Sequence, residues 1–306
     1  MTKIAIVVLN WNKPQLTLDT INSLIQIKNK SFDFQIFIVD NGSSDNSVKI
    51  FKKNFSKNKK IKILETNANL GYVGGNNFGI KFALKNKFGY VLLINNDVLV
   101  DPNFLEELII NTDSKFDITA PKIYFAPGYE FHHNRYSKKE IGNVLWFVGG
   151  KMDWNNIYGS NVGVDEVDHG QYNQIKTDYD FLTGCCLLIK KEVFQKIGFL
   201  DEKYFMYLED VDFCHRAKLK GFKLAYIPSS KIWHINAGSS KSGGNLHDYF
   251  ITRNRLIFGF RYAKLKTKFA LFRESIRNLF SISSSKWQKK GIIDFYIHKF
   301  NKGSWQ

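Results

Sequence analysis

The residues best suited to chemistry begin with Asn95-Asn96-Asp97, which follow a uniformly apolar run at residues 90–94. Such a run predicts a strand buried on both faces, and ligands of open parallel sheets collect beyond the carboxyl ends of the strands. A carboxylate flanked by two amides offers the oxygen ligands that divalent cations prefer. The same three residues also suit a polar turn. The sequence therefore leaves two interpretations of this point, a metal site or a turn.

A second group of candidate residues is acidic: Glu209, Asp210 and Asp212 lie at the start of a predicted helix that ends near Gly221. One carboxylate of such a cluster can act as a general base while another orients it. Acidic residues also stabilise helix N-termini without any catalytic role. Both interpretations of the cluster stay open.

Further along the chain, three cationic or titratable side chains suit a metal-bound or phosphorylated ligand. His234 ends a predicted strand, where it can bind a metal or a phosphate or serve the structure alone. Arg253 and Arg255 follow a stretch rich in Gly and Ser, at residues 238–244. The planar fork of arginine matches the oxygens of a diphosphate.

Residues near the ends of the early strands suit a nucleotide. Asp40 follows the second predicted strand, where it can accept hydrogen bonds from a base or ribose or close a turn. Four glycines come just before or at the start of a predicted helix at residues 76–87: Gly71, Gly74, Gly75 and Gly79. Glycines let a backbone approach an anion at a helix start. Their spacing matches neither the dinucleotide-binding pattern nor the P-loop, so we expect neither NAD binding nor ATP hydrolysis.

A long irregular section at residues 125–180 carries side chains that suit a sugar. Trp146 lies close to Gly149 and Gly150 there, and an exposed aromatic ring beside polar groups can stack on a sugar face. Trp146 is equally suited to the core. Gly184, inside the predicted strand that follows, permits close approach of a backbone or a ligand.

The elements that must position these residues alternate between strand and helix over the first hundred residues. Apolar runs predict strands at residues 3–10, 34–39, 61–65 and 90–94. Periodic segments predict helices between them, at residues 15–27, 47–55 and 76–87. This alternation predicts an α/β layer with a parallel sheet.

Composition excludes several classes of protein. A chain of 306 residues that is 44% hydrophobic can form a full core and is not disordered. Three cysteines, Cys185, Cys186 and Cys214, lack metal-site spacing and suit reduced thiols. No apolar run approaches the roughly 20 residues that cross a bilayer, and the apolar start has the character of a strand rather than a signal peptide. We therefore expect a cytoplasmic protein.

The basic charge is concentrated late in the chain. The formal net charge is +16, and residues 251–306 hold thirteen Lys and Arg against only Glu274 and Asp294. Apolar residues recur there at spacings of three and four, which predicts one stripe along a helix: Phe258, Tyr262, Leu265, Phe269, Phe272, Ile276 and Leu279. The stripe either packs on the rest of the chain or lies on an anionic membrane surface, through residues 255–306. No nucleic-acid recognition motif accompanies the charge, so we expect no nucleic-acid partner.

Six segments, in this order, resemble glycosyltransferase family 2, and more narrowly its bacterial rhamnosyltransferase-like branch: VVLNWN, VDNGSSD, NLGYVGGNN, LINND, YLEDVDFCHR and YFITRN. The similarity runs from about residue 3 to residue 255. It implies an α/β protein with the GT-A fold, in which a mostly parallel central sheet is flanked by helices. Residues 1–245 would form this domain, with a nucleotide-binding half at 1–100 and an acceptor-binding half at 101–245. Residues 246–306 would form a basic, amphipathic helical extension.

The resemblance also implies an activity, the inverting transfer of a sugar from a nucleoside diphosphate with the help of Mg²⁺ or Mn²⁺. The expected donor is dTDP-L-rhamnose, with a UDP-hexose or UDP-N-acetylhexosamine as the alternative. The expected acceptor is a saccharide, free or linked to a polyprenyl diphosphate, in the synthesis of surface polysaccharide at the inner face of the cell membrane. A non-catalytic nucleotide- or sugar-binding protein on the same fold is a further alternative.

Position by position, the resemblance implies a role for each candidate residue. The donor nucleotide would contact Asn10, Asn12, Asp40, Asn41, Gly71, Gly74, Gly75, Asn76, Asn96 and Arg253. Asp97 and His234 would hold the metal, and Asp210, next to Glu209, would be the catalytic base. The sugar and acceptor would contact Trp146, Gly149, Gly150 and Gly184. Asn95 stands where many members of the family carry the first acid of Asp-x-Asp, so Asp97 is the one carboxylate of this motif.

Overall fold

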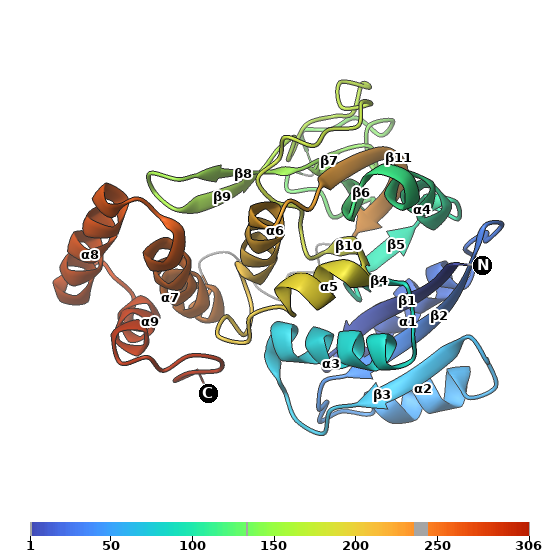
Figure 1. The fold of residues 1–306 in the computed structure, drawn as a ribbon, viewed down its shortest axis with the longest axis horizontal. Helices are drawn as coiled ribbons and strands as arrows, with labels where there is room; N and C mark the ends of the chain where they lie inside the picture. Colours follow the sequence, from blue (N-terminus) through green and yellow to red (C-terminus); the bar gives the residue numbers. More distant parts are fainter. Residues whose placement is uncertain (1, 133, 236–243, 306) are drawn as a thin grey trace.

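The first half of the chain forms the predicted α/β layer. The computed structural model describes residues 2–132, 134–235 and 244–305 (Figure 1). The strands of this half are β1 (Thr2–Asn10), β2 (Phe32–Asp40), β3 (Ile61–Glu65) and β4 (Tyr90–Ile94). The helices between them are α1 (Pro14–Leu24), α2 (Ser47–Phe55) and α3 (Gly71–Lys85). All four strands run parallel in the order β3-β2-β1-β4, which confirms the prediction.

Local sequence explains these elements. Every residue of β4 is buried, as its uniformly apolar run predicted. Pro14 is the first residue of α1, where its fixed φ suits a helix and its missing N–H costs no hydrogen bond. Helix α1 then buries Ile21 and Leu24 against the core.

The second half of the sheet is mixed. It continues from β4 through β10 (Cys186–Lys190), β6 (Ile118–Phe125), β11 (Leu224–His234) and β5 (Val98–Val100), and β7 (Leu145–Phe147) pairs with β6. Strand β10 is antiparallel to both of its neighbours, whereas β6 and β11 are parallel. The predicted strand at residues 181–190 begins only at Cys186, because the N–H groups of Leu182 and Gly184 donate to side chains of Cys214 and Asp210 instead of to a neighbouring strand.

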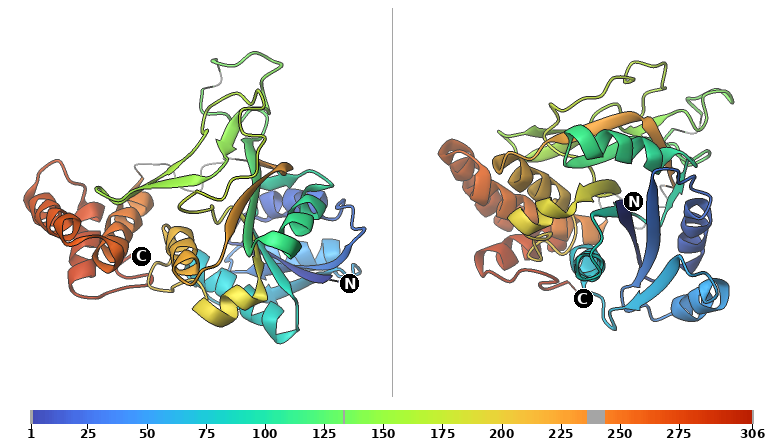
Figure 2. Two further views of the ribbon diagram at one scale, coloured as in Figure 1. Left: turned by 45° about the horizontal axis from the view of Figure 1, so that its top comes forward. Right: turned by 45° about the vertical axis from the view of Figure 1, so that its right-hand side comes forward.

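The remaining elements surround this sheet and extend one end of the molecule. They include α4 (Phe104–Lys115), α5 (Lys191–Ile197), α6 (Glu209–Leu219) and the hairpin β8 (Gly150–Asp153) with β9 (Tyr158–Asn161). Helices α7 (Asn245–Tyr262), α8 (Leu265–Phe280) and α9 (Lys286–Tyr296) group together away from β1–β3, as all three views show (Figures 1 and 2). No helix within the described ranges is long and apolar enough to cross a membrane.

The apolar stripe predicted along one late helix is divided between two helices. Helix α7 ends at Tyr262 and α8 begins at Leu265, because Ala263 and Lys264 adopt extended backbone angles with ψ near 158° and 156°. Phe258, before the break, is fully buried, whereas Leu265 and Phe269, after it, are 84% and 67% exposed. The prediction of one continuous stripe was therefore wrong.

Strand register brings the candidate residues to one edge of the sheet. Asn10 is directly beside Asp40 in the β1–β2 pair, and Val8 is beside Ile94 in the β1–β4 pair. The carboxyl ends of β1, β2 and β4 therefore lie together, and the segment Asn95–Asp97 leaves the sheet at the same edge. This is the edge where ligands of open α/β sheets bind.

Candidate functional site

A cavity of about 420 Å³ lies at this edge of the sheet, a volume within the usual range for small-molecule sites. Its wall combines the ends of β1 and β4, the start of α3, the segment before α6 and the end of the described chain. The lining residues are Leu9, Trp11, Lys13, Asn41, Asn69, Gly71, Tyr72, Asn95, Asn96, Asp97, Phe205, Met206, Leu246, Lys302 and Trp305. The sequence had singled out Asn41, Gly71, Asn96 and Asp97, together with Asn95 as a departure from the family motif.

A chain of hydrogen bonds connects the strand ends at the cavity. Asn96 Nδ2 donates to Thr17 Oγ1 at 2.9 Å, and Thr17 Oγ1 donates to Asn10 Oδ1 at 2.8 Å. Asn10 Nδ2 donates to Asp40 Oδ1 at 3.0 Å, and the other oxygen of Asp40 accepts from the N–H of Ser43 at 3.0 Å. Both Asn10 and Asp40 are buried. Each carboxylate oxygen of Asp40 can still accept a second hydrogen bond.

Two further asparagines predicted for the donor site hold neighbouring backbone. Asn12 Oδ1 accepts from the N–H of Ser44 at 2.8 Å. Asn41 Nδ2 donates to the carbonyl of Gly71 at 3.0 Å, and Asn41 Oδ1 accepts from the N–H of Leu70 at 3.0 Å. Asn41 therefore fixes the start of α3 beside β2.

The glycine-rich segment is not a loop before a helix, because α3 already begins at Gly71. A Cβ atom on Gly75 would lie 2.4 Å from Leu9 Cδ1, and one on Gly79 would lie 2.5 Å from Val7 Cγ1. These glycines therefore let α3 pack closely on β1.

Of the candidates on α3, Gly71 lies on the cavity wall, in a left-handed conformation with φ of 74°. Gly74 and Asn76 are buried within the first turns of the helix, and Asn76 Nδ2 donates to the carbonyl of Tyr72 at 2.9 Å. Gly74 and Asn76 are not among the residues that line the cavity, so their predicted contact with a nucleotide is not supported.

The structure brings Asp97 and His234 together. His234 pairs with Val98 where β11 meets β5, and its Nε2 atom lies 3.2 Å from Asp97 Oδ1. His234 is 7% exposed. The pairing of β11 with β5 therefore places the imidazole of His234 directly beside the carboxylate of Asp97, as the predicted metal site requires.

The donor atoms here fit a divalent cation. Among the described side chains, the buried Asn95 Oδ1 has no hydrogen-bond partner, and Asp97 Oδ1 has only its contact with His234. Two oxygens and one imidazole nitrogen are acceptable ligands for Mg²⁺ or Mn²⁺, with oxygen the preferred type. No group of three or more His, Cys, Asp or Glu side chains in the described ranges is placed to hold a metal ion by itself. A cation held here would therefore need further ligands from a bound diphosphate or from water.

The aromatic and glycine residues predicted for the sugar are packing residues in most cases. Trp146 is half-buried, and its ring centroid lies 4.5 Å from that of His234. Gly149 and Gly150 are buried beneath the rings of Tyr179 and Phe181, which would lie 2.3 Å from an added Cβ atom. The predicted sugar contact of these two glycines is therefore not supported, whereas Trp146 forms a wall behind His234.

Asp210 is half-buried at the first turn of α6 and is oriented by backbone. Its Oδ2 atom accepts from the N–H of Gly184 and its Oδ1 atom from the N–H of Val211, both at 2.8 Å. Burial raises the pKa of Asp210 above its ordinary value, and the two N–H donors oppose that rise. Gly184 thus positions the carboxylate predicted to be the base.

Glu209 is the more buried of the two adjacent acids. It is 6% exposed, and its Oε2 atom has no hydrogen-bond partner among the described residues. Burial, and next the charge of Asp210, raise the pKa of Glu209 well above its ordinary value. Asp212 differs, because it is fully buried in ion pairs with Arg216 at 2.7 Å and Arg261 at 2.9 Å. Asp212 is therefore a structural residue.

Tyr72 lies between the segment that carries Asp97 and the pair of acids Glu209 and Asp210. Its hydroxyl donates to the carbonyl of Gly184 at 2.7 Å, and its side chain lines the cavity beside Asp97. Burial raises the pKa of Tyr72 well above its ordinary value, and the charges of Glu209, Asp210 and Asp97 add to the rise. The candidate base and the candidate metal ligand therefore surround one tyrosine, although they are far apart in the sequence.

Arg253 does not reach the cavity. Its guanidinium is fully buried and donates to the carbonyls of Lys203 at 3.2 Å and Tyr204 at 3.1 Å, and to the hydroxyl of Tyr249 at 3.3 Å. The predicted contact with a diphosphate is therefore corrected to a structural role. Arg255 pairs with Glu274 at 2.8 Å. Most of the Gly- and Ser-rich stretch before them lies outside the described residues.

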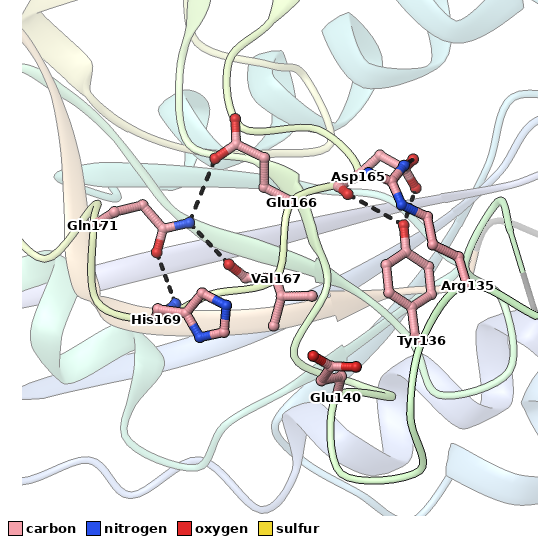
Figure 3. A pocket seen from close by; sticks show the side chains of 8 residues that line it. All are labelled: Arg135, Tyr136, Glu140, Asp165, Glu166, Val167, His169 and Gln171. Atoms are coloured by element: carbon pink, nitrogen blue, oxygen red, sulfur yellow. Dashed lines mark hydrogen bonds and ion pairs between the residues drawn. The ribbon is translucent and has the colours of Figure 1, made fainter.

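A second cavity, of about 370 Å³, lies among the irregular segments (Figure 3). Arg135 Nη1 pairs there with Asp165 Oδ2 at 2.7 Å, and Gln171 Nε2 donates to the carbonyl of Val167 at 2.9 Å. Several of its polar groups thus already have protein partners. None of the predicted site residues is among its described lining, so we assign the candidate site to the first cavity.

Comparison with known proteins identifies the family. The profile of glycosyl transferase family 2 matches residues 5–198. This chain belongs to that family. The family match covers β1 to α5, including Asp40, Asp97 and Gly184.

Among curated relatives, the "Low-salt glycan biosynthesis hexosyltransferase Agl10" of Haloferax volcanii is 27% identical over 62% of this chain and 55% of its own length. The "N-acetylglucosaminyl-diphospho-decaprenol L-rhamnosyltransferase" of Mycobacterium tuberculosis is 26% identical over 67% of each chain. The "Rhamnosyltransferase WbbL" of Escherichia coli is 24% identical over 56% of this chain and 63% of its own length. The chain thus spans between about half and two thirds of these relatives.

Solved structures support the GT-A fold. GalNAc-T7, crystallised with UDP, GalNAc and Mn²⁺, superposes with a TM-score of 0.67 at 15% identity, over 97% of this chain and 55% of its own. Residues 1–349 of TarS from S. aureus, in complex with UDP-GlcNAc, superpose with a TM-score of 0.58 at 14% identity, over 96% and 79%. The expected fold of this glycosyltransferase family 2 chain is therefore confirmed.

Sequence reasoning missed several residues of the cavity wall. Trp11 is 49% exposed there, directly after Asn10, and its position after a strand end was an available signal. Tyr72 lies between Gly71 and Gly74, and its residue type alone did not indicate a place on the cavity wall. Lys302 and Trp305 carried no signal, because nothing in the sequence places them near β4.

Proposed function

We propose that this family 2 chain transfers a sugar from a nucleoside diphosphate to a saccharide acceptor, with inversion at the anomeric carbon. The observation that carries the proposal is that Asp97, which is paired with His234, lines one cavity with Tyr72, and that the hydroxyl of Tyr72 donates to Gly184, whose N–H holds Asp210. A carboxylate–imidazole pair beside a separate, backbone-oriented carboxylate supplies the two functions that such a transfer needs, diphosphate binding and general base catalysis.

The donor we favour is dTDP-L-rhamnose, because two of the relatives are named rhamnosyltransferases. A UDP-hexose or UDP-N-acetylhexosamine is the second candidate, which the hexosyltransferase relative and the UDP-bound structural neighbours support. A saccharide on a polyprenyl diphosphate is the proposed acceptor, consistent with the name of the mycobacterial relative. In this scheme residues 1–100 supply most of the donor site and residues 101–245 the acceptor side.

The nucleotide would lie along the ends of β1, β2 and β4. The exposed indole of Trp11 offers a face on which a base can stack. Asp40 lies beside Asn10 at the end of β2, next to the residue that precedes Trp11, and each of its oxygens has one free acceptor position. It is therefore placed to bind the ribose or the base. Asn10 would orient Asp40 by its direct hydrogen bond, and Asn96 would act on Asn10 through Thr17.

Mg²⁺ or Mn²⁺ is the proposed cofactor, held by Asp97, His234 and the oxygen of Asn95. A bound cation would neutralise charge on the diphosphate. Replacement of the usual first acid by Asn95 leaves one carboxylate, so we expect weak cation binding before the donor arrives and stronger binding with it.

Asp210 is the proposed base. The acceptor hydroxyl attacks the anomeric carbon from the face opposite the diphosphate, the bond from that carbon to the diphosphate oxygen breaks, and the hydroxyl proton passes to the carboxylate of Asp210. The N–H groups of Gly184 and Val211 hold this carboxylate in place, so much of the acceleration comes from orientation. The pKa of Glu209 is raised by burial and by the charge of Asp210, which favours its neutral form and so limits the negative charge beside Asp210.

Replacement of Asp210 tests the proposal. Asp210→Asn should lower the transfer rate by about 10²–10⁴-fold, the usual contribution of a general base, while nucleotide-sugar binding is retained. The measurement is sugar transfer and hydrolysis across a panel of dTDP- and UDP-sugars with Mn²⁺. Asp117→Asn is the control, since Asp117 is half-buried beside Lys190 and not part of the described cavity wall. Unchanged transfer by Asp210→Asn would contradict the assignment.

We also propose that the enzyme lies on an anionic membrane surface through α8. Exposed apolar residues form one ridge on this helix: Leu265, Phe269, Phe272, Ile276 and Phe280. The opposite side of α8 is the one that packs on the protein, through Thr267, Leu271 and Ser275. Among the described residues, Tyr296 contacts the ring of Phe272, but most of the ridge stays exposed, and this favours the membrane interpretation of the basic tail.

A further inference from the structure

One wall of the donor cavity comes from the end of the described chain, far from the family motifs. Lys302 and Trp305 line the cavity together with Asn95 and Asp97, and Leu246 at the start of α7 joins them. The family match ends at residue 198, so it says nothing of these residues. Their function has to be argued from contacts and charge.

Residues 301–305 are held in place by specific contacts. The N–H of Ser304 donates to Asp294 Oδ2 at 2.7 Å, and the hydroxyl of Ser304 donates to Asp294 Oδ1 at 3.0 Å. The N–H of Asn301 donates to the carbonyl of Lys203 at 3.0 Å. The ring of Trp305 lies 4.5 Å from that of Trp287, centroid to centroid. This segment is therefore part of the folded structure.

Gly303 permits the close approach of this segment. Its φ is 61°, and an added Cβ atom would lie 2.1 Å from the hydroxyl of Tyr249 and 2.7 Å from Arg253 Nη1. Arg253, which sequence motifs had associated with the diphosphate, instead lies beneath the segment that carries Lys302. The buried arginine and its neighbours thus support the cavity wall from behind.

Charge at the cavity indicates what Lys302 can bind. The wall, as far as the structure describes it, carries two cations, Lys13 and Lys302, and one acid, Asp97. Within the described chain, no carboxylate lies at ion-pair distance from the ammonium group of either lysine. A lysine that lines a small-molecule cavity without a carboxylate partner suits an anion, since a charge-assisted hydrogen bond to a phosphate oxygen is stronger than one between neutral groups.

We propose that residues 301–305 complete the donor site, with Lys302 binding the diphosphate and Trp305 enclosing it. The inference rests on the proposed function and deepens it, because it assigns the cation that Arg253 does not provide. Lys302 neutralises the diphosphate in the bound donor and in the departing nucleotide. Trp305 is anchored on Trp287 and limits the access of water to that charge.

The experiment compares three variants of the full chain by calorimetric titration with UDP and dTDP, with Mn²⁺ present, and by ligand-observed NMR with uridine and thymidine. Lys302→Met should weaken nucleoside diphosphate binding by about tenfold, the loss of one charge-assisted contact, and leave nucleoside binding unchanged. Lys302→Arg should retain most of the diphosphate affinity. Lys299→Met is the matched control, since Lys299 is exposed and not part of the described cavity wall, and it should behave as the unaltered chain.

The possible results separate this inference from the proposed function. If the unaltered chain binds nucleoside diphosphates and Lys302→Met binds them equally well, the role of Lys302 is overturned and the transferase proposal stands. An equal loss of nucleoside and diphosphate binding would also overturn a phosphate contact. If the unaltered chain binds no nucleoside diphosphate or nucleotide sugar, both proposals are overturned.

Discussion

Glu209 and Asp210 show how neighbouring carboxylates acquire different properties from their surroundings. Asp210 accepts two backbone hydrogen bonds, from Gly184 and Val211. Glu209 is buried with an unpartnered oxygen, and its pKa is raised well above its ordinary value. A base has to be ionised and positioned, and Asp210 meets both conditions better than Glu209.

The raised pKa of Glu209 predicts a pH dependence of stability. Between the unfolded value, about 4.3, and the higher folded value, the folded state binds more protons than the unfolded state. The free energy of unfolding therefore falls as the pH rises through this window. Glu209→Gln removes this loss, so the free energy of unfolding of the variant should rise relative to that of the unaltered chain between about pH 5 and about pH 8.

Urea unfolding followed at several pH values measures this difference. Glu192→Gln is the control, because Glu192 is half exposed at the surface and approaches only Lys191, at 3.9 Å. Its stability should follow the pH dependence of the unaltered chain. Parallel curves for Glu209→Gln and the unaltered chain would show that Glu209 titrates normally.

At the scale of elements, the segment before α6 is held in an unusual conformation. Phe205, Tyr207 and Leu208 have φ values of 64°, 67° and 65°, in the left-handed region that non-glycine residues rarely adopt. Such residues each cost on the order of 1–3 kcal/mol and persist where the surrounding structure compensates. Asn254 provides that compensation, because its Nδ2 atom lies within 2.7–3.0 Å of the carbonyls of Tyr204, Met206 and Tyr207.

Arg253 and Asn254 therefore hold the segment that leads to Asp210, the proposed base. Arg253→Met should lower the free energy of unfolding by about 3 kcal/mol, because it removes three hydrogen bonds of a buried guanidinium, to the carbonyls of Lys203 and Tyr204 and to the hydroxyl of Tyr249. Hydrogen exchange of residues 203–208 should accelerate in this variant.

Arg255→Met is the matched control for Arg253→Met, since Arg255 makes a partly exposed ion pair with Glu274 and should cost about 1 kcal/mol or less. Unfolding by urea and hydrogen exchange provide the two readouts. Weakened nucleotide binding with unchanged stability and exchange would instead indicate that Arg253 contacts the donor directly.

At the scale of the whole molecule, α8 carries its apolar ridge and its basic residues on adjoining faces. Since a helix turns about 100° per residue, Lys266, Arg273 and Arg277 lie along one edge of the ridge, and Lys268 lies near the other. Anionic lipid attracts each basic residue by about 1 kcal/mol, and the ridge can enter the headgroup region.

The membrane proposal predicts salt-sensitive binding to anionic vesicles. A Leu265→Ser, Phe269→Ser chain should lose most of its sedimentation with vesicles of mixed zwitterionic and anionic lipid, while donor binding is unchanged. Ile110→Ser with Ile175→Ser is the control, because these residues are 56% and 46% exposed elsewhere on the surface. Equal loss in both chains, or undiminished binding by the first, would exclude α8 as the docking surface.

Much of the fold followed from local patterns. The apolar runs of β1, β2, β3 and β4 and the helix α2 were predicted within about two residues, because a buried strand or an amphipathic helix is encoded by adjacent side chains. The roles of the glycines could not be predicted from local patterns, since the close packing of Gly75 on Leu9 depends on a strand that is distant in sequence.

The sequence by itself determined the family and the parallel half of the sheet, and it singled out Asp97 as the candidate metal ligand, since six ordered motifs and the strand periodicity are local properties. Only the tertiary structure decided that His234 lies beside Asp97, that Arg253 is a buried structural residue and that Lys302 reaches the cavity. The physical reason is that these contacts join segments separated by long stretches of chain, and their distances are set by sheet order and helix packing. The candidate site at Asn95–Asp97 thus depends on residues that are its neighbours in space but distant in sequence.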